Sequence, residues 1–492
     1  MKKALTIVLV LLMVLCLSIG FVACNPDDGG NGGNGGGDEI EDILGITDTE
    51  IWVGNTAGVT GSLASIGAPF NYGMQAAFAK YNAEGGFDGR QVKLKHYDDV
   101  GDATKSISLM EKLIFEDEVF AIVGNFGSYA VNVNLETIKE EQVPMIYAAA
   151  GNDSLYNASA SSAEDKVVFP VQPLNVTEGR SLIARAFAGA LNTDLTLTGG
   201  LGATKVGVIS NSNEASKSLL QGIKEEANNL SAEKKNAISY QEVAGSDFSA
   251  AATALVATGC DCIIVTAIGA DYMAALTALA NANYTGSVLT SYNNASATVF
   301  NDAETKLITA TGADILGKMT IYSQGWIDIS STTYVYNKEG SALLAAYKAL
   351  DTALGTSNYT NGVVGFSEEY WGVAEQLYNY GIGTGQTAIA FTMSYDAYAL
   401  AGYIAGDLFC QGLKELKESG KALNRANLVE VMESKTFDIV LGDGVNFQNG
   451  ARKGVEAFGL SMFLNYNGAA TSITVPGTTL TSIEALRALI VG

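Results

Sequence analysis

The chain has 492 residues, in which 52 Asp and Glu outnumber 29 Lys and Arg and give a formal net charge of −23. No cluster of Lys and Arg occurs along it, so nucleic acid is not an expected partner, because phosphates need basic side chains. A single histidine argues against a zinc site of the Cys/His type, and five cysteines are too few for a disulfide scaffold. We therefore expect neither a metal nor a cofactor.

The N-terminus has the pattern of a secretion signal, in which two lysines precede an apolar run from 4 to 22. Its end, Val22-Ala23-Cys24, resembles the lipobox of bacterial lipoproteins, whose cysteine becomes the lipidated first residue. The resemblance implies a signal peptide at residues 1–23 and lipid attachment at Cys24. An uncleaved anchor is the alternative, because the apolar run is long enough to span a bilayer. Both place the rest of the chain outside the cytoplasm.

Residues 24–47 are rich in Gly, Asn and acidic side chains and cannot bury a core, so they are predicted to form a flexible tether. The roughly 445 residues that follow exceed one typical core and suit two.

The folded part alternates short β-branched runs with amphipathic stretches. We expect, in order, a strand at 51–54, a helix opened by Pro69, a strand at 91–97, a helix at 104–115 and a strand at 120–124. The rhythm starts again with a strand at 205–210, a helix at 216–229 and strands at 238–243 and 262–267. This alternation predicts two α/β units with parallel strands, right-handed crossovers and helices on both sheet faces.

Two further segments connect these units. Phe169-Pro170-Val171-Gln172-Pro173 holds two prolines, which favour an extended crossing between the units. Residues 326–390, rich in Tyr, Thr, Asn and Gly, are expected to form an elaborated loop or a helical insertion, and a helix follows at 394–416.

Six motifs occur in a fixed order along the chain. They are the turn at 81–86, Tyr97-Asp98-Asp99, the segments 123–128 and 144–151, the crossing at 169–179, and Ser394-Tyr395-Asp396-Ala397. In this order they resemble the leucine/isoleucine/valine-binding type of periplasmic binding protein, the receptors of branched-chain amino-acid ABC importers.

The resemblance implies the periplasmic binding protein type I fold, with two doubly wound α/β lobes and hinge crossings near 171, 323 and 437. Lobe 1 would comprise 48–171 and 324–436, and lobe 2 would comprise 172–323 and 437–492. The protein would be the solute-binding component of an ABC importer and not an enzyme. Its partners would be a small carboxylate ligand or amino acid, the permease subunits, and the membrane through the lipid.

A ligand site is predicted where strands end. Ser128 follows a strand and starts a helix, so its hydroxyl and the free N–H groups there can hold an anion; the alternative is a plain N-cap. Gly151 ends the next strand and permits close approach of a ligand, and ligands collect at strand carboxyl ends. In the relatives, the residues matching Ser128, Ala149 and Gly151 hold the ligand carboxylate.

The departures from the family pattern concern the ligand's amino group. The family's acidic partner of that group falls on Asn293, which cannot neutralise an ammonium, and family tyrosines fall on Ile66, Ala215 and Ile268. A buried ammonium without a carboxylate costs several kcal/mol. The ligand is therefore expected to be a branched-chain amino acid or a related acid or amide, with the forms lacking an α-amino group favoured by Asn293.

Hinge closure over the ligand is the expected mechanism, so residues of lobe 2 should also contact it. The candidates there are Asn211, Ile268 and Tyr292, and Tyr147 and Trp326 are either ligand contacts or packing.

Two other classes of protein were weighed. A hydrolase with Ser128 as nucleophile and His96 as base lacks the G-x-S-x-G elbow. A ligand-sensing receptor acting on a separate membrane partner remains the alternative to an importer component.

Overall fold

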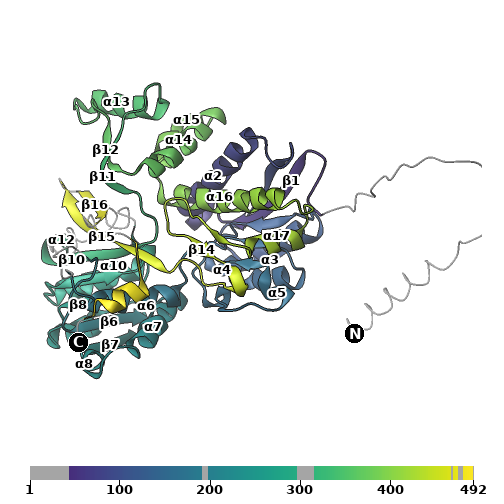
Figure 1. Ribbon diagram of the computed structural model, residues 1–492. Helices are drawn as coiled ribbons and strands as arrows, with labels where there is room; N and C mark the ends of the chain where they lie inside the picture. Colours follow the sequence, from purple (N-terminus) through teal and green to yellow (C-terminus); the bar gives the residue numbers. More distant parts are fainter. Residues whose placement is uncertain (1–43, 191–197, 296–314, 467–468, 475–479, 491–492) are drawn as a thin grey trace, which may run out of the picture. The chain divides into compact units, whose positions relative to one another are not determined.

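The computed structural model describes residues 44–492 except 191–197, 296–314, 467–468, 475–479 and 491–492 (Figure 1). The predicted signal peptide, Cys24 and most of the predicted tether therefore lie outside the described residues.

The first sheet contains five parallel strands in the order β2-β1-β3-β4-β5. Its strands are β1 (Glu50–Ala57), β2 (Gln91–Asp98), β3 (Ala121–Val123), β4 (Met145–Ile146) and β5 (Val168–Phe169). The helices that accompany it are α2 (Ala64–Ala83), α3 (Ala103–Phe115), α4 (Ser128–Glu140), α16 (Ala397–Glu418) and α17 (Arg425–Met432). The strands other than the edge strand β2 are largely buried on both faces, as the alternating βαβ pattern predicts for a parallel sheet.

Helix α2 begins earlier than the sequence indicates. It starts at Ala64, so Pro69 lies inside the helix and does not open it. The proline removes one hydrogen bond, to the carbonyl of Ser65, but Ser65 is exposed and water can replace the missing N–H. The helix continues through the proline for this reason.

Helices α2 and α16 lie side by side, with their backbones in contact (Figure 1). A Cβ atom on Gly73 would lie 1.8 Å from the carbonyl oxygen of Ala399, and one on Gly402 would lie 1.8 Å from that of Phe70. Glycine is therefore the residue that this close approach permits. The contact joins a helix near the N-terminus to one more than 300 residues later.

The second sheet has the order β16-β15-β10-β9-β8-β6-β7. Strands β10, β9, β8, β6 and β7 are parallel, and β15 and β16 pair antiparallel at the β10 side. Its strands are β6 (Val206–Asn211), β7 (Ile238–Val243), β8 (Cys262–Val265), β9 (Ser287–Thr290), β10 (Thr320–Gly325), β15 (Ala457–Tyr466) and β16 (Ala469–Thr474). The helices beside it include α6 (Asn175–Phe187), α7 (Glu214–Ala227), α9 (Ser249–Ala257), α10 (Ala270–Asn281) and α18 (Ile483–Ala488). The predicted second α/β unit is confirmed.

The first two passages between the sheets follow β5 and β10. β5 ends at Phe169 in the first sheet, and α6, which begins at Asn175, packs against β8 and β9 of the second. β10 ends at Gly325 in the second sheet, and Trp326 is buried in the core of the first.

The third passage falls later than the expected position near 437. Phe437, Phe447, Val455 and Phe458 are buried in the core of the first sheet, and β15 pairs with β10 of the second sheet from Gly459. The division of the chain into two lobes stays our proposal, and these contacts favour a boundary near 458.

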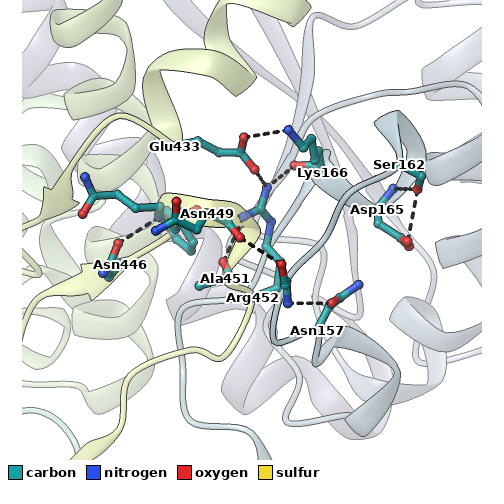
Figure 2. A network of polar contacts seen from close by, with 12 residues as sticks. Asn157, Ser162, Asp165, Lys166, Glu433, Asn446, Asn449, Ala451 and Arg452 are labelled. Carbon is teal, nitrogen blue, oxygen red and sulfur yellow. Dashed lines mark hydrogen bonds and ion pairs between the residues drawn. The ribbon is translucent and has the colours of Figure 1, made fainter.

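A buried arginine holds the segment before this third passage (Figure 2). The guanidinium of Arg452 donates to Glu433 Oε1 and to the carbonyl oxygen of Lys166, both at 2.6 Å, and lies 4.4 Å from the ring centre of Phe169. The backbones of Arg452 and Asn157 also exchange two hydrogen bonds. The chain around 433–452 is thereby attached to the edge strand of the first sheet.

The segment expected as a loop or helical insertion contains both strands and helices. It comprises β11 (Ser330–Tyr336), α13 (Ala342–Leu354), β12 (Val363–Phe366), α14 (Glu368–Gly383) and α15 (Thr387–Met393). Its aromatic side chains pack in a core that the insertion shares with α2 and α16, in which Tyr336 and Trp371 stack with ring centres 4.1 Å apart. None of the described helices combines the length and apolarity that a membrane crossing requires.

Candidate functional site

The predicted ligand residues of the first sheet lie at its carboxyl edge, where the parallel strands end. Gly127, with φ of +96°, is the N-cap of α4, and Ser128 is its exposed first residue. The N-cap alternative for Ser128 is therefore wrong, because a residue with positive φ occupies that position. The Ser128 hydroxyl stands at a helix N-terminus without a capping duty, where it can face an anion.

Ala149 lies beside this turn but is already bonded to it. Its N–H donates to the carbonyl of Asn125 at 2.8 Å, and its own carbonyl accepts from the N–H of Gly127 at 3.0 Å. Only the second lone pair of the Ala149 carbonyl is left for a ligand.

Tyr147 is fully buried with a left-handed φ of +58°, a conformation that costs a non-glycine residue free energy. Its ring lies 5.7 Å from that of Phe70 and 6.4 Å from that of Trp326. Among the described residues its hydroxyl has no hydrogen-bond partner, and burial raises its pKa. Tyr147 and Trp326 thus form an aromatic contact between β4 and the second crossing.

Gln172, which the sequence analysis did not single out as a ligand residue, connects Gly151 to Tyr292. The side-chain amide of Gln172 is described with its oxygen toward the neighbouring donors and its NH2 group away from them. In this orientation the oxygen accepts from the N–H of Ala150 at 3.0 Å and from the N–H of Gly151 at 3.3 Å. The Tyr292 hydroxyl lies 3.2 Å from the same oxygen and 3.3 Å from the carbonyl of Pro173. The signal that could have found Gln172 is its position between the two prolines of the first crossing.

The loop at 291–294, after β9, is held by a buried carboxylate. Glu178 accepts from the Ser291 hydroxyl at 2.6 Å and from the Tyr292 N–H at 2.7 Å, and it is fully buried. Burial raises the pKa of Glu178 to about 8, although both hydrogen bonds act in the opposite direction. The side-chain amide of Asn293 donates to Ser291 Oγ at 3.0 Å, and its side chain is half-buried.

The second sheet presents one carboxylate at its carboxyl edge that the sequence analysis missed. Asp271 lies in the first turn of α10, and its Oδ2 accepts from the Asn211 amide at 2.7 Å. Ile268 is half-buried between β8 and α10. Asp271 could have been noticed as the acidic residue that follows the strand and Gly269, and it is a potential partner for an amino group.

Ile66 and His96, the base of the hydrolase alternative, both lie in the first α/β unit. Ile66 is half-buried in α2, against the core of the first sheet. His96 Nδ1 lies 2.9 Å from the side-chain amides of both Asn55 and Asn71. The histidine is thus engaged by two side-chain amides, one on β1 and one on α2, and not by Ser128.

A cavity of about 330 Å³ lies elsewhere, beside the insertion. Its lining includes Asp328, Glu369 and Asp443, and none of the predicted ligand residues.

The doubly wound parallel sheets with polar groups at their carboxyl edges define a type I periplasmic binding protein. Residues 50–366 match the sequence profile described as periplasmic binding protein, and the chain belongs to this family. Family members of this kind are binding proteins rather than enzymes.

Among curated proteins, the chain is 34% identical over 108 residues to the Leu/Ile/Val-binding protein homolog 2 of Brucella abortus. The match covers 22% of this chain and 29% of the relative, so the chain spans under a third of the curated relative's length.

Two solved structures share the fold. A solute-binding protein of R. palustris in complex with benzoate is 16% identical, has a TM-score of 0.57 and is covered over 99% of its length and 89% of this chain. The second is the branched-chain amino acid transporter substrate binding protein LivJ of Streptococcus pneumoniae in complex with isoleucine. It is 17% identical, with a TM-score of 0.53, and the match covers 99% of its length and 87% of this chain.

Proposed function

We propose that this protein is the extracytoplasmic solute-binding component of an ABC importer and that it captures a small ligand bearing a carboxylate. The observation that carries the proposal is the convergence of hydrogen-bond donors at one carboxyl edge. Ser128 opens α4 there, and the N–H groups of Ala150 and Gly151 already hold an oxygen atom. Such donors suit an anionic oxygen.

The opposing contacts would come from the second sheet, when the two lobes close over the ligand. The loop at 291–294 carries Tyr292 and Asn293, and its anchor, Glu178, fixes where these side chains stand. Closure needs contacts that exist only in the closed form, and these residues together with Asn211 and Ile268 are the ones we propose for them.

The ligand class follows from the groups that could face an amino group. Asn293 is neutral, and Asp271 is engaged by Asn211. An acid without an α-amino group is therefore the ligand we favour, although the relatives' printed ligands include both isoleucine and benzoate. The permease subunits as partner, and attachment to the membrane through Cys24, belong to the same proposal.

The test is thermal unfolding of the purified protein with branched-chain amino acids, their keto acids, benzoate and the matching amides. A ligand at about 100 times its dissociation constant stabilises the folded state by about 2.7 kcal/mol, which raises the melting temperature by several degrees. We expect the acids without an amino group to give this shift. A shift with leucine or isoleucine alone would contradict the assignment of Asn293, and no shift with any compound would contradict the binding function.

A further inference from the structure

Two backbone N–H groups and one phenol surround the Gln172 amide oxygen. This oxygen lies 3.0 Å from Ala150 N, 3.3 Å from Gly151 N and 3.2 Å from the Tyr292 hydroxyl. Two of these groups also have a second acceptor, since the Ala150 N–H donates to the Ala148 carbonyl at 2.9 Å and the Tyr292 hydroxyl to the Pro173 carbonyl at 3.3 Å. The two N–H groups come from the segment that follows β4, and the hydroxyl comes from the loop after β9. Two backbone N–H groups and a phenol around one oxygen form the kind of environment that holds a carboxylate.

The position of Gln172 in the chain explains how its oxygen is held there. Prolines at 170 and 173 restrict the backbone of the crossing, so the side chain leaves from a stiff segment. Gln172 itself is half-buried and not enclosed in a core.

We infer that the Gln172 amide oxygen is an internal stand-in for the ligand's carboxylate oxygen, which a ligand must displace in order to bind; this rests on the proposed function. An amide oxygen is neutral, and hydrogen bonds to a carboxylate are roughly twice as strong as those between neutral groups, so a carboxylate gains from the exchange. Because the amide must leave before any ligand enters, it lowers the affinity of every ligand of this site by the same factor.

Two substitutions separate this role from a structural one. Gln172→Ala removes the competitor, and Gln172→Glu replaces it with a carboxylate that occupies the donors more firmly. Gln221→Ala, at an exposed glutamine of α7, is the matched control. The affinities of benzoate, benzamide, leucine and 4-methyl-2-oxopentanoate are measured by calorimetry on the purified protein.

We expect Gln172→Ala to bind the acids roughly tenfold more tightly, because the binding-competent population is no longer reduced by the bound amide. The ratio of the benzoate and benzamide affinities should stay the same in this variant, because removing the bound amide raises both affinities by the same factor. Gln172→Glu should bind the acids at least roughly tenfold more weakly, and Gln221→Ala should match the unmodified protein. Weaker acid binding in both Gln172 variants would overturn the inference. If the glutamine only supported the structure of the site, either replacement would lower the affinity for the acids.

A second measurement does not depend on whether any of these four compounds binds. Formate can fill the space that Gln172→Ala leaves, so at high concentration it should raise the melting temperature of this variant by about 1–2 °C more than that of the unmodified protein or Gln221→Ala. An equal effect on all three proteins would overturn the stand-in role. If formate discriminates but no panel compound binds, the assignment of Gln172 stands and the proposed ligand class fails.

Discussion

The fully buried carboxyl of Glu178 makes the stability of this protein depend on pH in an unusual direction. Burial raises its pKa from the ordinary 4.5 to about 8, and the hydrogen bonds from Ser291 and Tyr292 do not offset this. A carboxyl with a raised pKa in the folded state stabilises the protein fully below its ordinary pKa. This stabilisation is lost as the pH rises through the window from about 4.5 to about 8.

The substitution Glu178→Gln tests this account, because the amide mimics the protonated acid at nearly the same volume. One pKa unit corresponds to about 1.4 kcal/mol, so a shift from 4.5 to about 8 corresponds to at most about 5 kcal/mol between the two ends of the window. We expect the variant to match the unmodified protein within about 1 kcal/mol at pH 5. At pH 8.5 it should be more stable by a few kcal/mol, because it has no charge to bury.

The measurement is urea unfolding of both proteins at half-unit steps from pH 5 to 9, with the difference between their free energies of unfolding plotted against pH. Groups that titrate elsewhere cancel in this difference. A variant that is less stable by the same amount at every pH would refute the reasoning. That result would mean that Glu178 is ionised throughout and that Ser291 and Tyr292 stabilise its charge.

Three further predictions concern other parts of the chain. Gly402→Ala should lower the free energy of unfolding by about 3 kcal/mol in urea titrations, because its Cβ would lie 1.8 Å from the Phe70 carbonyl, whereas Gly372→Ala in α14, which meets nothing within 4 Å, should not. Arg452→Leu should cost about 3 kcal/mol in the same assay, because the carbonyl of Lys166 loses its donor and Glu433 keeps only its ion pair with Lys166; a loss below about 1 kcal/mol would contradict the role of the guanidinium. Asp271→Asn should leave the calorimetric affinity for benzoate within about twofold, and a tenfold loss for leucine in the same variant would instead identify Asp271 as the partner of an amino group.

The candidate site was only partly accessible to sequence reasoning. Ser128 and Gly151 could be proposed from the sequence because the end of a parallel strand, followed by a helix, is a local pattern, and such ends meet at one edge of a sheet. Gln172 and Glu178 were missed as functional residues because their partners are far away in sequence. Glu178 bonds to residues more than 100 positions later, and Gln172 reaches Tyr292 over 120 positions.

The sequence by itself determined the class of fold, because the alternation of strands and helices is a periodic signal that each segment carries alone. It also determined the family, through motifs in a fixed order, and the presence of a proline-rich first crossing. Only the tertiary structure decided that the segment around 437–455 packs with the first sheet, where the buried Arg452 meets Glu433 and Phe169. Only it could show Gln172 filling the donors of Gly151, because such contacts form where distant segments meet and leave no periodic trace in the chain.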